Sequence, residues 1–285
     1  MEFFILATVL VGATSKILNK IGSHKVSIYL ILLIQNISGA ATSLAALLYT
    51  DNTSLTIPES YYPALVINAV LWLLAGILSF QGIRHTQASI RESVTQSRLI
   101  FVPLIAVIFL GETVTPLAAL GTLAVFLGIV IAVYKKELSF MHPDMRGIGY
   151  ALGASLLIAV TSSIDKYIVS GVSPLFYAFL LYAAQTVVFL TFLTRVRRNE
   201  LFSLPMYTDG LFVFCAGLMS GVFYLLQLWL YQNFDLHIAY PFIQLASASA
   251  LLLAIVFLKE WDRIFFKVLG FGIAAIGAMM VRFAT

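Results

Sequence analysis

The chain has 285 residues, of which 61% are hydrophobic and only 11% are charged, and its formal net charge is +4. A soluble domain is usually about half apolar and about one quarter charged. Too few polar side chains are present to cover a globule of this size in water, which excludes a soluble enzyme, a nucleic-acid-binding domain and a disordered chain. The single cysteine, Cys215, lies in an apolar run and offers neither an intrachain disulfide nor a metal site.

Ten apolar runs are long enough to cross a bilayer, since a spanning helix needs roughly 20 mostly apolar residues. In chain order the expected spans are Phe3–Ile21, Val26–Thr50, Tyr62–Gly82, Ala88–Leu110, Pro116–Tyr134, Gly147–Ile168, Pro174–Thr194, Gly210–Tyr231, Ile238–Leu258 and Ile264–Arg282. Turn residues or charges interrupt the apolar runs between them. The acidic Glu2 and the lack of a basic region before the first run argue against a cleaved signal peptide.

The sequence repeats itself at an offset of about 148 residues. The segment Ala106–Glu112 (AVIFLGE) closes the fourth span, and Ala254–Glu260 (AIVFLKE) closes the ninth. Glycines seven residues apart follow each segment: Gly121 and Gly128, then Gly270 and Gly277. Spacing of this kind favours close approach of two helices, so we expect these glycines to be packing residues.

A third match lies near the start of each half, where residues 14–16 (TSK) resemble residues 161–163 (TSS). Three matches in the same order divide the chain into two five-span repeats, 1–139 and 140–285. Because five is odd, the second half must enter the membrane from the opposite side. The predicted fold is an all-α integral membrane protein with ten transmembrane helices in two inverted five-helix repeats, which is typical of secondary transporters with a midplane substrate site.

At these residues the chain resembles the EamA-type family of the drug/metabolite transporter superfamily. Pro103 precedes Phe109–Glu112 (FLGE) in the first half, and spaced glycines follow, as in the repeats of that family. The second half departs from the pattern, because Leu251 stands at the proline position and Lys259 replaces the glycine. The resemblance implies a ten-helix carrier for a small metabolite, such as an amino acid or related organic solute, without ATP hydrolysis or a cofactor. Substrate identity does not transfer, because members of the family differ widely in what they carry.

The fourth span holds the densest group of polar side chains. Only twelve residues, Leu99 to Leu110, follow Arg98 in the fourth span, too few to cross the membrane, so Arg98 must lie within the span. A charge there costs about 2.5–3.5 kcal/mol and normally faces the bundle interior. At helical spacing Arg91, Thr95 and Arg98 share one face, and Gln96 lies on the adjacent stripe with Glu92. This face suits a carboxylate held by a guanidinium, hence an anionic or zwitterionic ligand. The alternative is that Arg91 lies at the membrane interface and Arg98 pairs with a helix end.

Further substrate-binding candidates are polar or aromatic residues inside other spans: Lys16, Trp72, Asp165, Tyr240 and Gln244. Gln244 occupies the repeat position of Gln96, so the two amides either face one cavity from two sides or bond neighbouring helices. Snorkelling to the interface is the favoured interpretation for Lys16 and for Lys166, which follows Asp165. Plain packing is favoured for Trp72.

Glu112 and Glu260 end their spans beside turns, where a structural contact is favoured over a role in proton coupling. No HExxH, GxSxG or phosphate-cradling glycine loop occurs, and the four histidines are scattered, so we expect no enzymatic activity and no metal site. Two alternatives to a carrier remain: a lipid-linked-sugar flippase or its subunit, and a membrane sensor or assembly partner without transport activity.

The basic residues are distributed unevenly along the chain. Thirteen Lys and Arg residues lie in or beside the odd-numbered loops, whereas the even-numbered loops and the C-terminus hold two. Because basic residues favour the cytoplasm, this bias predicts cytoplasmic odd loops and both termini on the opposite side. Proteins of the resembled family are often drawn with both termini in the cytoplasm, so the two predictions disagree. We expect a multi-pass protein of a bacterial-type inner (plasma) membrane, with the lipid bilayer and a small-molecule substrate as its partners and no nucleic acid.

Overall fold

The computed structural model describes residues 2–22, 27–50, 56–85, 93–133, 145–196, 207–257, 259 and 264–284. The described residues form helices and turns, with no β-strand among them. Within these ranges, ten helical segments are long and apolar enough to cross a membrane. The all-α fold with ten spans is therefore confirmed.

The helices follow the expected spans closely. The first half contains α1 (Glu2–Gly22), α2 (Ile28–Tyr49), the 3₁₀ turn η1 (Glu59–Tyr61), α3 (Tyr62–His85), α5 (Arg98–Ile105), the π-helix η2 (Ala106–Leu110) and α6 (Pro116–Val133). The second half contains α7 (Met145–Val169), α8 (Pro174–Val196), α10 (Tyr207–Asn233), α11 (Leu236–Phe257) and α12 (Ile264–Phe283).

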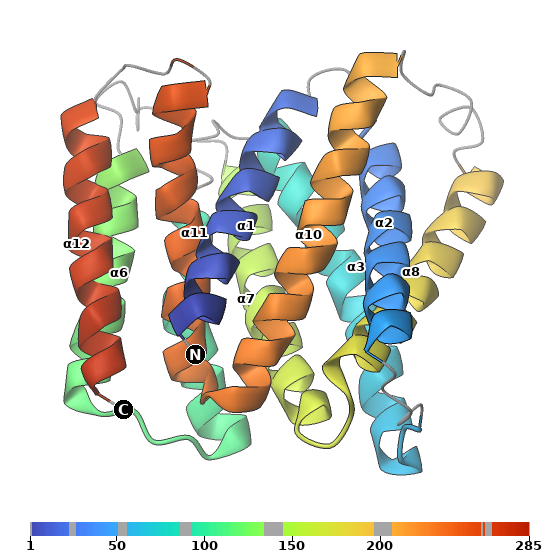
Figure 1. Cartoon of the computed structure of the whole chain (residues 1–285), viewed down its shortest axis with the longest axis horizontal. Coiled ribbons are helices and arrows are strands. Elements are labelled where there is room, and N and C mark those ends of the chain that lie inside the picture. Colours follow the sequence, from blue (N-terminus) through green and yellow to red (C-terminus); the bar gives the residue numbers. More distant parts are fainter. Residues whose placement is uncertain are drawn as a thin grey trace.

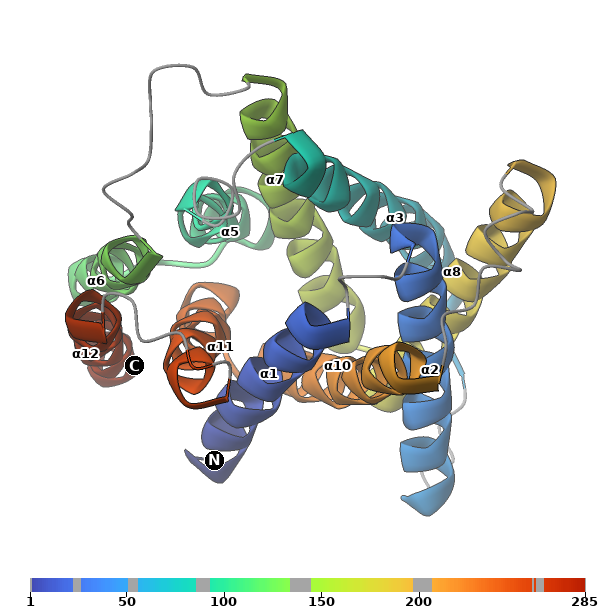
Figure 2. The ribbon, with the colours of Figure 1, turned by 90° about the horizontal axis from the view of Figure 1, so that it is seen from above.

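The first helix of each half packs against the third and fourth spans of the other half. Helix α1 of the first half lies against α10 and α11, and helix α7 of the second half lies against the corresponding α3 and α5. Seen from above, the α6–α12 pair stands at one end of the bundle and α8 at the other (Figure 2). Both ends of the chain lie toward the same end of the helices (Figure 1). This exchange is the pattern of an inverted repeat.

The repeated glycines form the contact between α6 and α12. A methyl group on Gly128 would lie 2.5 Å from the carbonyl oxygen of Gly270, and one on Gly270 would meet the carbonyl oxygen of Gly128 in turn. Gly121 and Gly277 are related in the same reciprocal way, at 2.6 Å in each direction. Early residues of one helix thus meet late residues of the other. The helices run antiparallel at backbone contact distance, which explains why glycine is required at these four positions.

The fourth span is not the continuous α-helix Ala88–Leu110 that we expected. Around Gln96 and Ser97 the backbone bonds run from i to i+3, with Gln96 N 3.2 Å from Ser93 O and Leu99 N 2.8 Å from Gln96 O. The segment ends in η2 and then at Gly111, whose φ of 69° places it in the left-handed region. This geometry interrupts the α-helix at Gln96 and Ser97 but does not separate Thr95 from Arg98, because residues i and i+3 lie on one face in a 3₁₀ turn. Arg91 lies outside the described residues.

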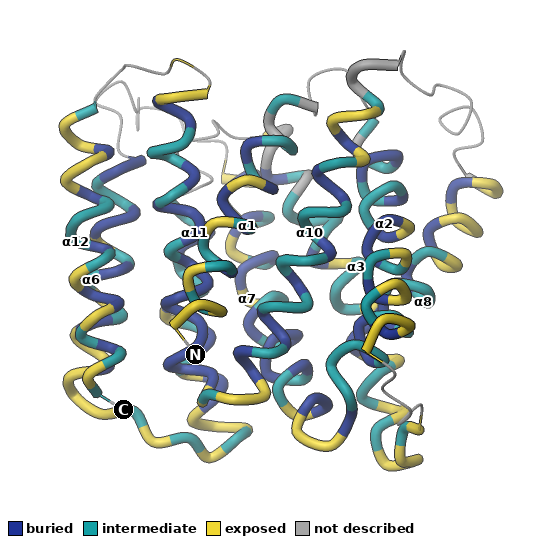
Figure 3. The backbone as a smooth tube through the Cα atoms, in the orientation of Figure 1, coloured by how far each residue is buried: buried dark blue, intermediate teal, exposed yellow. Residues whose placement is uncertain are grey.

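The distribution of polar and apolar side chains is the reverse of that in a soluble protein. Large apolar side chains are exposed on the outside of the bundle, such as Phe3 at 74%, Phe109 at 76% and Phe265 at 70%. Polar side chains such as Asn68 and Asp165 are fully buried. Helix α11 carries the longest run of buried residues, which Figure 3 shows in dark blue. An apolar exterior around a polar interior is expected for a protein whose surroundings are the hydrocarbon core of a bilayer.

Candidate functional site

One group of polar side chains gathers around α11. Tyr240 and Gln244 are almost fully buried on this helix, at 2% and 4% exposure. The Tyr240 hydroxyl interacts with Gln244 and with the guanidinium of Arg98, which comes from α5 in the other half of the chain. The Arg98 Nε atom is buried and has no hydrogen-bond partner. Arg98 therefore lies inside the bundle, as its depth in the sequence required.

Lys16 reaches the same helix from α1. Its Nζ atom donates a hydrogen bond to the hydroxyl of Ser247, which in turn donates to Gln244 Oε1 at 3.3 Å. The snorkelling interpretation of Lys16 is therefore wrong, since the ammonium group binds a buried serine within the bundle. The structure thus brings Lys16, Arg98, Tyr240 and Gln244 together from α1, α5 and α11. We call these four residues the α11 group.

Thr95 and Gln96 are buried just before α5, at 4% and 0% exposure. The hydroxyl of Ser155 on α7 donates to the main-chain carbonyl of Thr95 at 3.3 Å. This bond ties the irregular turn to a neighbouring helix. The turn is a structural element as well as a candidate wall of the site.

A second polar group surrounds Asp165 on α7. Its Oδ1 atom accepts three hydrogen bonds, from Asn68 Nδ2 at 2.6 Å, from the Tyr177 hydroxyl at 2.5 Å and from the Tyr224 hydroxyl at 2.9 Å. Asn68 also donates to the Tyr177 oxygen at 2.6 Å. The donors come from α3, α8 and α10. We call Asp165 and these three residues the Asp165 group.

Trp72 belongs to the Asp165 group rather than to the α11 group. Its ring meets Tyr224 edge-on, with centroids 6.0 Å apart, and Tyr182 meets Tyr224 in a similar way at 5.4 Å. The indole nitrogen lies close to Asp165 but forms no hydrogen bond. Aromatic packing, the interpretation favoured from the sequence, is what the structure shows, with the carboxylate as its neighbour.

Tyr231 of α10 lies between the two groups. It is fully buried, accepts a hydrogen bond from Gln227 Nε2 at 2.7 Å, and lies within electrostatic range of both Tyr240 and Asp165. The two groups are therefore parts of one polar interior.

Sequence reasoning named Asp165 but missed its partners Asn68, Tyr177 and Tyr224. An available signal was Asn68, an amide seven residues into the third span whose polarity demands a partner in hydrocarbon. The tyrosines gave no comparable signal, because tyrosine is a common packing residue in a chain with 13% aromatics.

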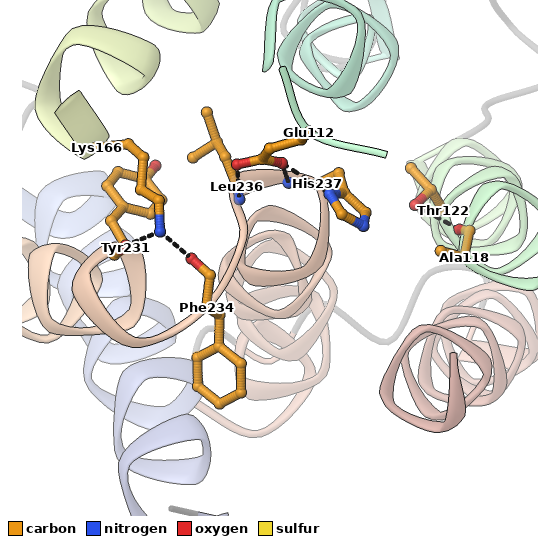
Figure 4. A network of polar contacts seen from close by, with 8 residues as sticks. All are labelled: Glu112, Ala118, Thr122, Lys166, Tyr231, Phe234, Leu236 and His237. Carbon is orange, nitrogen blue, oxygen red and sulfur yellow. Dashed lines mark hydrogen bonds and ion pairs between the residues drawn. The ribbon is translucent and has the colours of Figure 1, made fainter. Parts of the chain in front are cut away.

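Glu112 forms a structural contact at the start of α11 (Figure 4). Its Oε1 atom accepts from the Leu236 N–H at 2.6 Å, and its Oε2 atom accepts from the His237 N–H at 3.0 Å and contacts His237 Nδ1 at 2.7 Å. Burial raises the pKa of Glu112, but hydrogen bonds from His237 and Leu236 outweigh burial and lower its pKa below the usual value. Glu112 thus caps a helix of the opposite half. Glu260 lies outside the described residues.

Lys166 caps the end of α10 in the same region (Figure 4). Its Nζ atom donates to the carbonyl oxygens of Tyr231 at 2.6 Å and Phe234 at 2.7 Å. A lysine that satisfies the last carbonyls of a helix is a terminal cap. The snorkelling interpretation is therefore wrong for Lys166 too.

In the part of the chain that the structure describes, no three His, Cys, Asp or Glu side chains are grouped so as to hold a metal ion. Ten bilayer-length helices around a buried polar interior define a multi-pass integral membrane protein.

The comparison with protein families identifies which one. The EamA-like transporter family matches residues 1–134 and 145–283, so the chain belongs to this family of the drug/metabolite transporter superfamily. A solved structure titled "Crystal structure of protein" superimposes with a TM-score of 0.84 at 15% sequence identity, covering 99% of this chain and 96% of that one. At this identity the likeness shows the fold. A search of curated proteins gave no match.

Proposed function

We propose that the protein is a secondary carrier that moves a small anionic or zwitterionic metabolite, such as an amino acid or related organic solute, by alternating access. Membership of a transporter family supports the transport activity. We further propose that the protein lies in a bacterial-type inner (plasma) membrane.

The observation that carries the choice of substrate is the buried Nε atom of Arg98, which has no acceptor. A guanidinium offers five N–H donors, and a buried donor without a partner costs about 1–3 kcal/mol. A carboxylate supplied by the substrate would satisfy this donor with a charge-assisted bond. The hydroxyl of Tyr240, the amide of Gln244 and the second positive charge of Lys16 support the same end of the ligand.

The contacts between the two halves of the chain support a mechanism of alternating access. The α11 group draws residues from both halves, and Glu112 of the first half caps α11 of the second. A carrier must break and remake such contacts between halves as its site opens to each side. The glycine contact of α6 and α12 lies at one end of the bundle (Figure 2).

The test begins with a thermal-shift screen of the purified protein against amino acids and small carboxylates. A bound ligand at 100 times its Kd stabilises the folded state by about 2.7 kcal/mol. A lipid-linked-sugar flippase or a sensor without transport activity would give no such shift with these soluble compounds. Compounds that shift the melting temperature are then assayed for uptake into proteoliposomes.

Arg98→Ala should abolish this uptake while the protein remains folded, and Arg98→Lys should retain part of it. Arg195→Ala is the matched control, because Arg195 is an exposed arginine at the end of α8. Near-normal uptake by Arg98→Ala would refute the assignment. Loss of folding in that variant would point to a structural role for Arg98 instead.

A further inference from the structure

Only one of the two carboxylate oxygens of Asp165 is used. Oδ1 accepts the three hydrogen bonds that the other members of the group donate to Asp165, whereas Oδ2 is buried and has no partner. The Oδ1 atom of Asn68 is likewise buried without a partner. The two side chains are thus joined through one atom of each, and the remaining atom of each is an unsatisfied acceptor.

Two acceptors cannot satisfy each other, because an ionised carboxylate and an amide oxygen both lack a hydrogen to donate. Each buried acceptor left in this state costs about 1–3 kcal/mol, and a buried carboxylate needs compensation for its charge as well.

None of the side chains that face Asp165 among the described residues carries a positive charge that would compensate its negative charge. They are Asn68 and Trp72 from α3, Tyr177 and Tyr182 from α8, and Tyr224 and Tyr231 from α10. All six side chains are neutral near pH 7. The next residue on α7, Lys166, gives its ammonium group to two carbonyl oxygens at the end of α10, and Arg98 interacts with Tyr240. Among the described residues, the carboxylate is therefore held by hydrogen bonds rather than by a cation.

We propose that Asp165 reversibly binds the proton that drives transport. One proton on Oδ2 turns that atom from an unsatisfied acceptor into an O–H donor. The buried negative charge thereby disappears. The step is a simple equilibrium between a carboxylate plus a proton and a carboxylic acid. Calcium or magnesium would fit less well, because these ions take six or more oxygen ligands.

This inference rests on the proposed carrier function and adds its energy source. A closed, buried Asp165 group favours the protonated acid, and release of the proton requires that water reach the carboxylate. Tyr231 lies within electrostatic range of both Asp165 and Tyr240 of the α11 group. The conformational change that exposes the substrate site can thus also expose Asp165, so substrate and proton move in a fixed ratio.

Infrared spectroscopy tests the proton directly and needs no substrate. The purified protein is titrated with base while the carbonyl band of protonated carboxylic acids is recorded. Wild type should show such a band in mildly acidic solution, and the band should disappear as the pH rises. The band should be absent from Asp165→Asn and retained in Glu112→Gln, which removes the carboxyl group at the start of α11. Absence of the band from wild type, or its persistence in Asp165→Asn, would overturn the proposal.

Tyr224→Phe provides a second variant that keeps the carboxyl group. It removes one hydrogen bond that favours the ionised form, so the acid band should persist to higher pH than in wild type. An unshifted titration in a folded Tyr224→Phe protein would count against a proton at Asp165.

Proteoliposomes then test the coupling with a compound that wild type transports. An imposed pH gradient should drive accumulation by wild type, whereas Asp165→Asn should exchange the compound but lose all gradient-driven accumulation. Accumulation driven by a sodium gradient instead, or by neither gradient, would overturn the proton assignment. Failure of wild type to move any compound would count against the carrier function, while the infrared result would still stand.

Discussion

The contact between Glu112 and the start of α11 can be tested by Glu112→Gln. The glutamate side chain is 5% exposed and accepts bonds from two backbone N–H groups and from the ring of His237. Glutamine keeps one acceptor oxygen but places an N–H₂ group opposite groups that themselves donate.

The expected cost follows from these contacts. Loss of a helix cap costs about 0.5–2 kcal/mol, and loss of a negative charge at a helix N-terminus costs a further 0.3–1 kcal/mol or so. We therefore expect Glu112→Gln to lower the free energy of unfolding by about 2 kcal/mol, which is several degrees in melting temperature. Tryptophan fluorescence during heating of the detergent-solubilised protein measures the shift.

The effect should depend on pH in a defined direction. The pKa of Glu112 is lowered by folding, so its carboxylate contributes stability above the unfolded pKa of about 4.3, and that stability is lost as the pH falls through the lower folded pKa. The difference between wild type and Glu112→Gln should be constant from pH 7 to about pH 5 and should shrink below that.

Glu59→Gln is the matched control, because Glu59 is an exposed glutamate in η1. It should melt at the wild-type temperature. Equal melting temperatures for Glu112→Gln and Glu59→Gln at neutral pH would refute the capping argument, as would a difference that does not shrink in acid.

Two further predictions concern the cavity and the orientation. In a protein without Cys215, cysteines at positions 96 and 244 should both react with a water-soluble thiol reagent in the open state and be protected by substrate. Both glutamines are buried in this structure, so reaction at neither position would show permanently packed sites. Alkaline phosphatase fused after Thr285 should be active if the thirteen-to-two charge bias sets the orientation, whereas fluorescence from a cytoplasm-only reporter would refute it.

Hydropathy alone located the spans, because hydrocarbon demands a long apolar run and backbone bonds satisfied within each helix. It could not locate the 3₁₀ geometry at Gln96 and Ser97 or the π-helix of η2. These features depend on neighbours, such as Ser155 bonding the carbonyl of Thr95. The depth of Arg98 was predicted well, and the predicted face that joins it to Arg91 stays a prediction, because Arg91 lies outside the described residues.

The candidate site was predictable where an energetic cost marks a residue. Arg98 and Asp165 are charged residues inside spans, and both lie within the bundle, as does Lys16, for which the sequence favoured snorkelling. The residues that hydrogen-bond a buried charge cannot be recognised in this way, because tyrosine and asparagine are tolerated in many environments. Lys166 was misread because its target is a set of backbone carbonyls, which no sequence pattern identifies.

The reciprocal glycine contacts restrict how the two halves of the gene product can diverge. A methyl group on Gly128 meets the carbonyl of Gly270, and a methyl group on Gly270 meets the carbonyl of Gly128, so both changes fill the same gap. A substitution on one side therefore cannot be compensated by a substitution on the other, and both members of each pair must remain small together. The fourth and ninth spans face no such coupled restriction, and one has kept an arginine where the other has none. The likeness of the two halves is thus held in place where α6 meets α12 and is relaxed between the fourth and ninth spans.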